Sequence, residues 1–557
     1  MSKDLLRTIG VALVVWAVLL FTASRSTLWD RDEARYATAA IEMEATGNAL
    51  YPTFNHELRA FQPALIYWLM SASIHVFGPS EIAARLPSTI AIALVCLLTG
   101  LLAREFFGSG VLAATIAGTS PMLMLTGIAA TTDATLLLFT FLAQWIFVRA
   151  WLYGSRPWHV PAMGVAMGLA LLTKGPVGLV IPALCISTAL VLAKGRSQAG
   201  PFIGKLALAC VLGCVIFLAW GLPANAATGG EYWRIAIVER LPQRVFTAME
   251  NHGGQGVLGF LLHLPYYPLV FVVGFLPWTL FLTLVRPAYK AMDSSTTEDS
   301  WARSSRGLRA LLVGMILPPF VFWTLIVSKL PHYIQPVFPW VALLVAGVVF
   351  TTFRGPSLPL AQARLRWVFF SFGTVAFVGA AGLLTLPWLP LPMGFSGVTE
   401  AGFGLGLMLF FILGLLGWCY WKGNIHSALK IHAAGMLVLL VACGFFVMPR
   451  LEAIIKPAQT LTREIASQIP SGARIASFGW HEPSMNFYLG GRRILHLYDP
   501  KSLGMFLEEP GPKFLILNEE SAHGLSLPPD GFHLLARQSG FDHVKGRFTN
   551  LTAFLRE

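Results

Sequence analysis

Long apolar segments separated by short polar ones fill the chain up to residue 448. An apolar helix of about 20 residues crosses the roughly 30 Å hydrocarbon core of a bilayer. The pattern therefore predicts a polytopic α-helical membrane protein with about thirteen transmembrane helices, near residues 8–24, 81–103, 111–128, 132–149, 158–173, 176–193, 206–222, 258–285, 309–327, 334–353, 367–387, 402–421 and 431–448. No small-residue cleavage site follows the first apolar segment, so we expect it to be a retained helix and not a signal peptide.

The first polar loop, residues 25–80, is long enough to hold structure of its own. Residues 32–46 contain neither Gly nor Pro and predict one helix. Residues 61–77 are apolar and aromatic, but the segment is short and has charged neighbours. We expect it to form a helix that lies along the membrane interface.

Residues 449–557 differ in character from the rest of the chain, because charge rises and long apolar segments are absent. Three short strand-like runs, at 474–478, 493–497 and 513–517, follow a helical pattern around 458–468. The sequence thus predicts two parts. Residues 1–448 would form a transmembrane catalytic domain, and residues 449–557 a small α/β domain outside the membrane.

The composition agrees with this division, with 55% hydrophobic and only 12% charged residues, against roughly 25% charged in a soluble protein. The net charge of +12 fits basic loops that orient the helices and contact anionic lipid, so no nucleic-acid partner is expected. Basic residues are more numerous on one set of loops, which should be cytoplasmic. The loop 25–80, Lys174, the loop 223–257, Lys329 and the C-terminal domain would then lie outside, in the periplasm of a bacterial inner membrane.

No cofactor is predicted. The six cysteines all lie in predicted helices, which argues against disulfides and against a Cys-based metal site. The outer loops contain no HExxH motif, no DxD motif and no close pair of histidines, and His481 beside Glu482 stands isolated. No phosphate-binding loop follows a strand, so direct use of ATP or a dinucleotide is not expected. Whether a divalent cation assists is left open.

The richest cluster of charge is the run Asp32–Tyr36, directly after the first helix. On a helix, Arg35 and Tyr36 lie on the same face as Asp32. Such a group can neutralise a phosphate and accept a proton from a hydroxyl, and Glu33 and Arg59 are further substrate-binding candidates in this loop. The alternative is a local salt bridge at the start of a helix.

Further polar residues stand at the outer ends of other helices. Asp133 could be a second acid of the site, or only a cap that stabilises its helix. Lys174 and Lys329 could bind a lipid phosphate, or extend to the interface as ordinary anchors. His332, three residues after Lys329, could be a base, a ligand or only an interfacial residue, and Tyr333 beside it is a further substrate-binding candidate.

The outer loop 223–257 mixes acids and bases, among them Glu239, Arg240 and Arg244. Glycines near its end would make it mobile. The loop could close over a cavity as a lid or could be a solvated connector.

Four motifs together resemble bacterial members of the protein O-mannosyltransferase superfamily, which are GT-C glycosyltransferases, and among them the ArnT-like aminoarabinose transferases. In chain order the motifs are residues 32–36, 78–88, 172–176 and 328–333. The resemblance implies the GT-C fold and an inverting transfer of a sugar from a polyprenyl phosphate, such as undecaprenyl phosphate, to an acceptor outside the membrane. It also implies Asp32 as the main catalytic carboxylate, with Asp133 as a second, and Arg35, Tyr36, Lys174 and Lys329 around the donor phosphate.

One position departs from the ArnT-like pattern, because Phe61-Gln62-Pro63 stands where these relatives usually carry Glu-Lys-Pro. The change removes an acid and a cation, which favours a sugar or an acceptor other than aminoarabinose and lipid A.

The sequence therefore predicts a glycosyltransferase that acts on lipid A, lipopolysaccharide, another glycan of the cell envelope, or a protein. The rival is a flippase or transporter of lipid-linked sugars, and a non-catalytic scaffold is a third class. Transporters usually place ionisable groups near the middle of the membrane. Here the predicted spans carry almost no charge and the acids gather on one side, which favours the enzyme.

Overall fold

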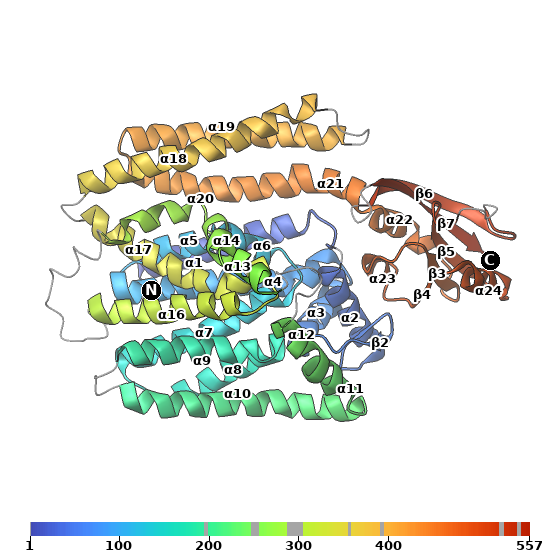
Figure 1. Ribbon diagram of the computed structural model, residues 1–557, viewed down its shortest axis with the longest axis horizontal. Coiled ribbons are helices and arrows are strands. Elements are labelled where there is room, and N and C mark those ends of the chain that lie inside the picture. Colours follow the sequence, from blue (N-terminus) through green and yellow to red (C-terminus); the bar gives the residue numbers. More distant parts are fainter. Residues whose placement is uncertain are drawn as a thin grey trace.

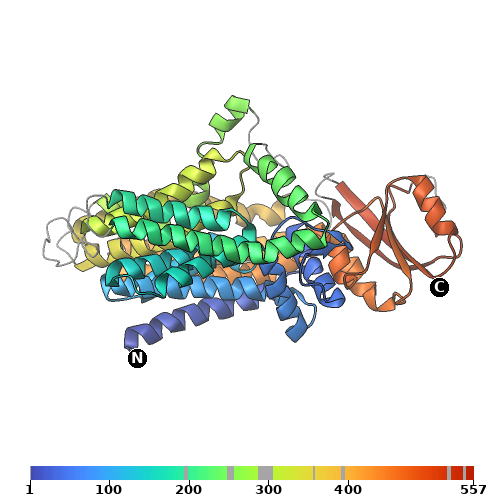
Figure 2. The same ribbon diagram turned by 90° about the horizontal axis from the view of Figure 1, so that it is seen from below.

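The computed structural model describes residues 2–29, 31–193, 199–246, 256–286, 305–354, 358–389, 395–522, 528–542 and 547–557. Its long helices lie side by side in one bundle, and a small sheet domain stands at one end of that bundle (Figure 1). The N-terminus lies toward the opposite end. The view turned by 90° shows the same order, with bundle, short helices and sheet domain in succession (Figure 2).

Within the described residues, nine helical segments are long and apolar enough to span a membrane. Six are single helices: α1 (Lys3–Ala23), α4 (Glu81–Phe107), α7 (Thr132–Tyr153), α10 (Ala199–Ala227), α16 (Ser305–Leu325) and α19 (Ser396–Trp421). The others are α17 (Phe338–Arg354) preceded by η5 (Pro331–Val337), α18 (Leu358–Thr385) followed by η6 (Leu386–Trp388), and the run of α20 (Ile425–Ala442), η7 (Cys443–Val447) and α21 (Met448–Ile455). The chain is thus a multi-pass membrane protein.

The predicted count of thirteen spans is not exact, although all thirteen segments contain helix. The predicted span 111–128 is broken into α5 (Val111–Gly118) and α6 (Pro121–Gly127), since Pro121 has no N–H to continue the first helix. Two others, α8 (His159–Lys174) and α9 (Val177–Leu192), have only 16 residues each. The predicted span 258–285 comprises α13 (Gly256–Leu262), α14 (Tyr266–Gly274) and η3 (Trp278–Leu284), with a bend of 106°.

Short elements lie between the bundle and the sheet domain (Figure 1). The predicted helix 32–46 is confirmed as α2 (Asp32–Thr46), which ends at Gly47 in the left-handed conformation with φ 67°. A hairpin of β1 (Thr53–Phe54) and β2 (Glu57–Leu58) and the helix α3 (Leu65–Phe77) follow.

The segment expected to be an outer loop from residue 223 is mostly helical as far as the structure describes it. Helix α10 continues to Ala227, and α11 (Glu231–Trp233), the π-helical η1 (Arg234–Glu239) and α12 (Arg240–Phe246) succeed it. The predicted outer loop therefore holds short helices in its described part. Of the three glycines expected to make a lid mobile, Gly253 and Gly254 lie outside the described residues, and Gly256 begins α13 with a positive φ of 70°.

The C-terminal domain is built on a five-stranded sheet of order β4-β3-β5-β7-β6. The three predicted strands are confirmed as β3 (Arg474–Phe478), β4 (Ile494–Leu497) and β5 (Lys513–Asn518), which pair in parallel. The predicted helical stretch is α22 (Pro457–Ile465) with η8 (Ala466–Gln468), and α23 (Ser484–Tyr488) and α24 (Pro500–Glu508) connect the strands. The antiparallel pair β6 (His533–Asp542) and β7 (Arg547–Arg556) was not predicted, since polar residues interrupt the alternation of both strands.

Two glycines set the position of Lys174 near the end of the bundle. Helix α8 ends at Lys174, and Gly175 turns the chain with a positive φ of 69°. A Cβ on Gly178 would lie 2.2 Å from the main chain of Ala170, so only glycine lets α9 approach α8 this closely. The close turn holds Lys174 at its tip.

Candidate active site

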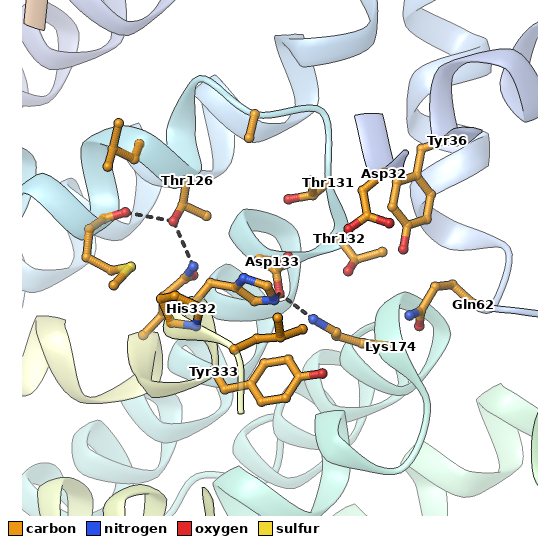
Figure 3. Close-up of a pocket in the computed structure, with 16 residues that line it drawn as sticks. Asp32, Tyr36, Gln62, Thr126, Thr131, Thr132, Asp133, Lys174, His332 and Tyr333 are labelled. Carbon is orange, nitrogen blue, oxygen red and sulfur yellow. Dashed lines mark hydrogen bonds and ion pairs between the residues drawn. The ribbon is translucent and has the colours of Figure 1, made fainter. Parts of the chain in front are cut away.

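A cavity of about 330 Å³ is lined in part by α2, which lies at the end of the bundle that faces the sheet domain (Figure 1). Residues of α2, the α6–α7 connection, the end of α8 and η5 line it (Figure 3). Its polar lining consists of Asp32, Tyr36, Gln62, Thr126, Thr131, Thr132, Asp133, Lys174, His332, Tyr333 and Gln335. Six residues that the sequence singled out, from distant parts of the chain, therefore meet in one place.

Asp133 and Lys174 form a buried ion pair in this cavity. Only 11% of the Asp133 side chain and 9% of the Lys174 side chain are exposed. His332 Nε2 lies 3.6 Å from Asp133 Oδ1, and Lys174 Nζ lies 5.1 Å from the centre of the Tyr333 ring. The first turn of α7 suits a carboxylate, because its free N–H groups carry partial positive charge.

Asp32 and Tyr36 enter the cavity from α2, with Thr132 between Asp32 and the ion pair (Figure 3). Asp32 is exposed, whereas Tyr36 is buried. The Arg59 guanidinium lies 5.4 Å from the centre of the Tyr36 ring. Burial opposes the charge of Arg59, but its interactions with Tyr67, Tyr36 and Asp32 raise its pKa above the ordinary value. Arg59 thus provides a fixed positive charge behind the two cavity residues.

A second cavity, of about 150 Å³, adjoins the first and shares Gln62 and Lys174 with it. Its lining is largely aromatic and apolar, with Phe61, Phe217, Trp220, Tyr232 and Trp233. The Tyr232 hydroxyl donates a hydrogen bond of 2.7 Å to the main-chain oxygen of Gln62. The Arg240 guanidinium lies 3.0 Å from the centre of the Phe61 ring. Arg240 was predicted as a candidate, but this cavity was not, although aromatic residues recur in the sequence where α10 ends.

Two expected site residues are placed elsewhere. Lys329 does not line either cavity, and its ammonium donates to the oxygens of Trp323, Thr324 and Ile326 at the end of α16. Burial lowers its pKa to about 8. The structure does not bring Lys329 to either cavity, because free carbonyls at a helix end attract a nearby cation. Its role at the donor phosphate stays a prediction.

Glu33 does not line either cavity. Only 4% of its side chain is exposed, and it forms a buried ion pair of 2.7 Å with Arg85. Burial alone would raise the pKa of the Glu33 carboxyl, but the Arg85 guanidinium and the N–H groups of Trp29 and Ala130 lower it. Glu33 therefore makes a buried structural contact, and a role for it in substrate binding stays a prediction.

Two further candidates, Arg35 and Glu239, do not line either cavity. Arg35 is half-buried on α2 and lines neither cavity. Glu239 is paired with Arg234, which also binds Glu231. The side chain of Arg244 lies outside the described residues. Within the described part of the chain, no three His, Cys, Asp or Glu side chains converge in a way that could hold a metal ion.

Comparisons with known proteins give a consistent result. Residues 62–220 match the family described as dolichyl-phosphate-mannose-protein mannosyltransferase. The chain is 30% identical over 395 residues to "undecaprenyl phosphate-alpha-4-amino-4-deoxy-L-arabinose arabinosyl transferase 2" of Sodalis glossinidius (strain morsitans), covering 69% of this chain and 66% of the relative. The corresponding transferase of Edwardsiella ictaluri (strain 93-146) is 30% identical over 330 residues, or 58% of this chain and 55% of that protein.

Among solved structures, the chain is similar to ArnT from Cupriavidus metallidurans bound to undecaprenyl phosphate. The TM-score is 0.72 at 20% identity, and the match covers 98% of this chain and 97% of the other. The GT-C fold and the ArnT-like resemblance, both expected from the four sequence motifs, are confirmed.

Proposed function

We propose that this chain, which is ArnT-like and has the GT-C fold, is an integral-membrane glycosyltransferase that moves a sugar from a polyprenyl-phosphate donor to an acceptor outside the membrane. The observation that carries the proposal is the cavity in which Asp32 lies across from the Asp133–Lys174 pair (Figure 3). Two carboxylates with a cation between membrane helices suit the displacement of a phosphate by a hydroxyl.

The reaction would be a single displacement with inversion. An acceptor oxygen forms a bond to the anomeric carbon while the bond from that carbon to the phosphate oxygen breaks. Asp32, the exposed carboxylate, takes the proton of the acceptor hydroxyl. If the acceptor is itself a phosphate, no base is needed and Asp32 orients it. Negative charge grows on the departing polyprenyl phosphate.

Lys174 is the group best placed to stabilise that charge. Its ammonium stands where the two cavities meet and is shared by both linings. Asp133 holds the ammonium in place and offsets the cost of its burial. Asp133 is thus proposed to act through Lys174, and Arg59 adds positive charge behind Tyr36. His332 and Tyr333 close the opposite wall of the cavity.

We assign the prenyl chain of the donor to the aromatic cavity. Phe61, Phe217 and Trp220 offer apolar contact, and Arg240 stands among them as a second cation for the phosphate. The sugar would then point into the polar cavity, past Gln62 and Lys174. Similarity to a structure described with bound undecaprenyl phosphate supports this choice of lipid.

The excess of basic residues on the opposite loops supports a location in a bacterial inner membrane with the cavity facing the periplasm. The acceptor is a periplasmic glycolipid such as lipid A, another envelope glycan, or a protein. The chain aligns with no more than 66% of the length of the relatives described above, and Phe61-Gln62-Pro63 departs from the motif expected of ArnT-like transferases. We therefore propose the reaction class without transferring their sugar and acceptor.

The test uses the full-length protein in lipid nanodiscs with undecaprenyl-phosphate sugars labelled in the sugar. Label that appears on an envelope acceptor, with inverted anomeric configuration, supports the proposal. Label that crosses a vesicle membrane without transfer identifies a flippase instead. Mass spectrometry of the cell envelope of a deletion strain names the missing sugar and its acceptor together.

A further inference from the structure

The segment that leads from α1 into α2 is held by side chains from two other parts of the chain. We call residues 26–29 the strap. The Thr27 N–H donates to Glu452 (2.9 Å) and the Leu28 N–H to the Tyr488 hydroxyl (3.0 Å). The Leu28 oxygen accepts from Gln459 (2.8 Å) and Lys456 (3.2 Å). All four of these side chains come from α21, the start of α22 or α23, next to or within the C-terminal domain.

Arg85 of α4 holds the strap from the membrane side. Its guanidinium is buried and donates to the oxygens of Ala23 (2.8 Å), Ser26 (2.7 Å) and Thr27 (2.8 Å). The same guanidinium makes two bonds to Glu33, of 3.0 and 2.7 Å. A planar guanidinium bound on both sides in this way fixes the orientation of its partners.

Glu33 joins the two helices that carry the acids of the cavity. One of its oxygens accepts from the N–H of Trp29 at 2.7 Å, and the other accepts from the N–H of Ala130. Asp32 is the residue before Glu33, at the start of α2, and Asp133 lies three residues after Ala130, in the first turn of α7. A single carboxylate therefore ties both acid-bearing helix starts to each other.

The contact between α2 and the C-terminal domain is also apolar. Phe487 of α23 packs in one buried cluster with Ala37, Ala40 and Ile41 of α2. The hydrogen bonds to the strap therefore accompany a packed, buried interface between α2 and α23. Because α2 carries Asp32, a shift of this interface would move the carboxylate.

We propose that Glu33 is a positioning residue that fixes Asp32 relative to Asp133, and that the C-terminal domain holds this arrangement through the strap. The proposal rests on the proposed function for its effect on turnover, but its structural part is independent of it. Displacement of a catalytic group by about 1 Å can reduce the rate 100-fold without any change in binding. The C-terminal domain then acts on turnover without contacting substrate.

Hydrogen exchange measured by mass spectrometry on the full-length protein tests the structural part. Glu33→Gln should raise exchange in two segments distant in sequence, residues 26–32 and 128–134. Tyr488→Phe and Gln459→Leu should raise exchange in residues 26–32. Unchanged exchange at 128–134 in Glu33→Gln would overturn the bridging role of Glu33.

Turnover tests the functional part. We expect Tyr488→Phe combined with Gln459→Leu to lower kcat about 10-fold or more, with KM for the donor within about twofold. The matched control is Lys513→Met, which removes a buried lysine that donates to main-chain oxygens of the same domain far from the strap. This variant should lower the melting temperature yet leave kcat and strap exchange unchanged.

An equal loss of kcat in Lys513→Met would show that general destabilisation is responsible and would overturn the proposal. Increased strap exchange with wild-type kcat would also overturn it. If the wild-type protein transfers no sugar, the proposed function fails, while the exchange data still decide whether Glu33 and the strap couple the two helices.

Discussion

The Lys174 ammonium and the Asp133 carboxylate form a buried ion pair between the end of α8 and the start of α7, at the point where a polar and an aromatic cavity meet. Neither charge is stable alone in such a place, because burial without a partner is costly. The pair therefore holds a positive charge where the donor phosphate is proposed to lie.

Lys174→Met should abolish measurable transfer and lower stability. The substitution removes the cation and leaves the Asp133 carboxylate unpaired, at a cost of up to about 3 kcal/mol, the lower end of the range for buried pairs because the cavity reaches solvent. Transfer assays and thermal unfolding in nanodiscs measure both effects. Lys422→Met, at an exposed lysine, is the control. Wild-type turnover in Lys174→Met would exclude the lysine from the reaction.

Asp32→Asn should reduce kcat at least 1,000-fold, on the order of what a positioned base contributes, with expression and melting temperature unchanged. The asparagine keeps the shape of the side chain but cannot accept the proton, and an exposed residue contributes little to stability. Glu57→Gln, an exposed acid in the same loop, serves as the control. The assignment fails if the Asp32→Asn protein turns over normally with a hydroxyl acceptor.

Gln62→Lys should lower KM for the polyprenyl-phosphate donor more than it changes kcat. The new ammonium would stand in the lining shared by both cavities, close to Lys174, where it can bind phosphate. The decrease in KM should become smaller as the salt concentration rises, because salt screens the attraction between ammonium and phosphate. Gln62→Met is the matched uncharged variant. A KM for Gln62→Lys equal to that of Gln62→Met would place the phosphate elsewhere.

The sequence predicted the helical segments well and the site in part, for physical reasons that differ by residue. Apolar length identifies helices, so α2 and the nine long spans were found, but it does not reveal a break such as that before Pro121. Asp32, Asp133 and Lys174, which meet in one cavity, were chosen as candidates because charge at the end of an apolar helix is conspicuous.

The direction in which each charged side chain points could not be predicted from the sequence. Lys329 and Glu33 look like Lys174 and Asp32 in the sequence, yet one ammonium turns back to the end of α16 and one carboxylate turns inward to Arg85. The spacing of residues along the sequence does not determine which partner a charged side chain contacts in the folded protein. Arg85 was missed as a partner for the same reason, since 52 residues separate it from Glu33.

The C-terminal domain should lose stability as pH falls from about 6.5 toward 4. Ser477, His481 and His496 lie within hydrogen-bond distance of one another, with His481 Nδ1 3.1 Å from His496 Nδ1. Burial and the neighbouring His496 lower the pKa of His481 to about 4, and burial lowers that of His496 as well. The unfolded chain binds protons at the ordinary histidine pKa near 6.5, which the folded domain does not, so acidification over this pH range favours unfolding.

Melting temperatures of the full-length protein, measured between pH 4 and 8, should therefore fall less steeply with acidification in His481→Gln than in the wild type. His533→Gln, at an exposed histidine of β6, is the control and should keep the wild-type slope. Parallel curves for wild type and His481→Gln would contradict the prediction, because His481 would then carry the same proton in both states.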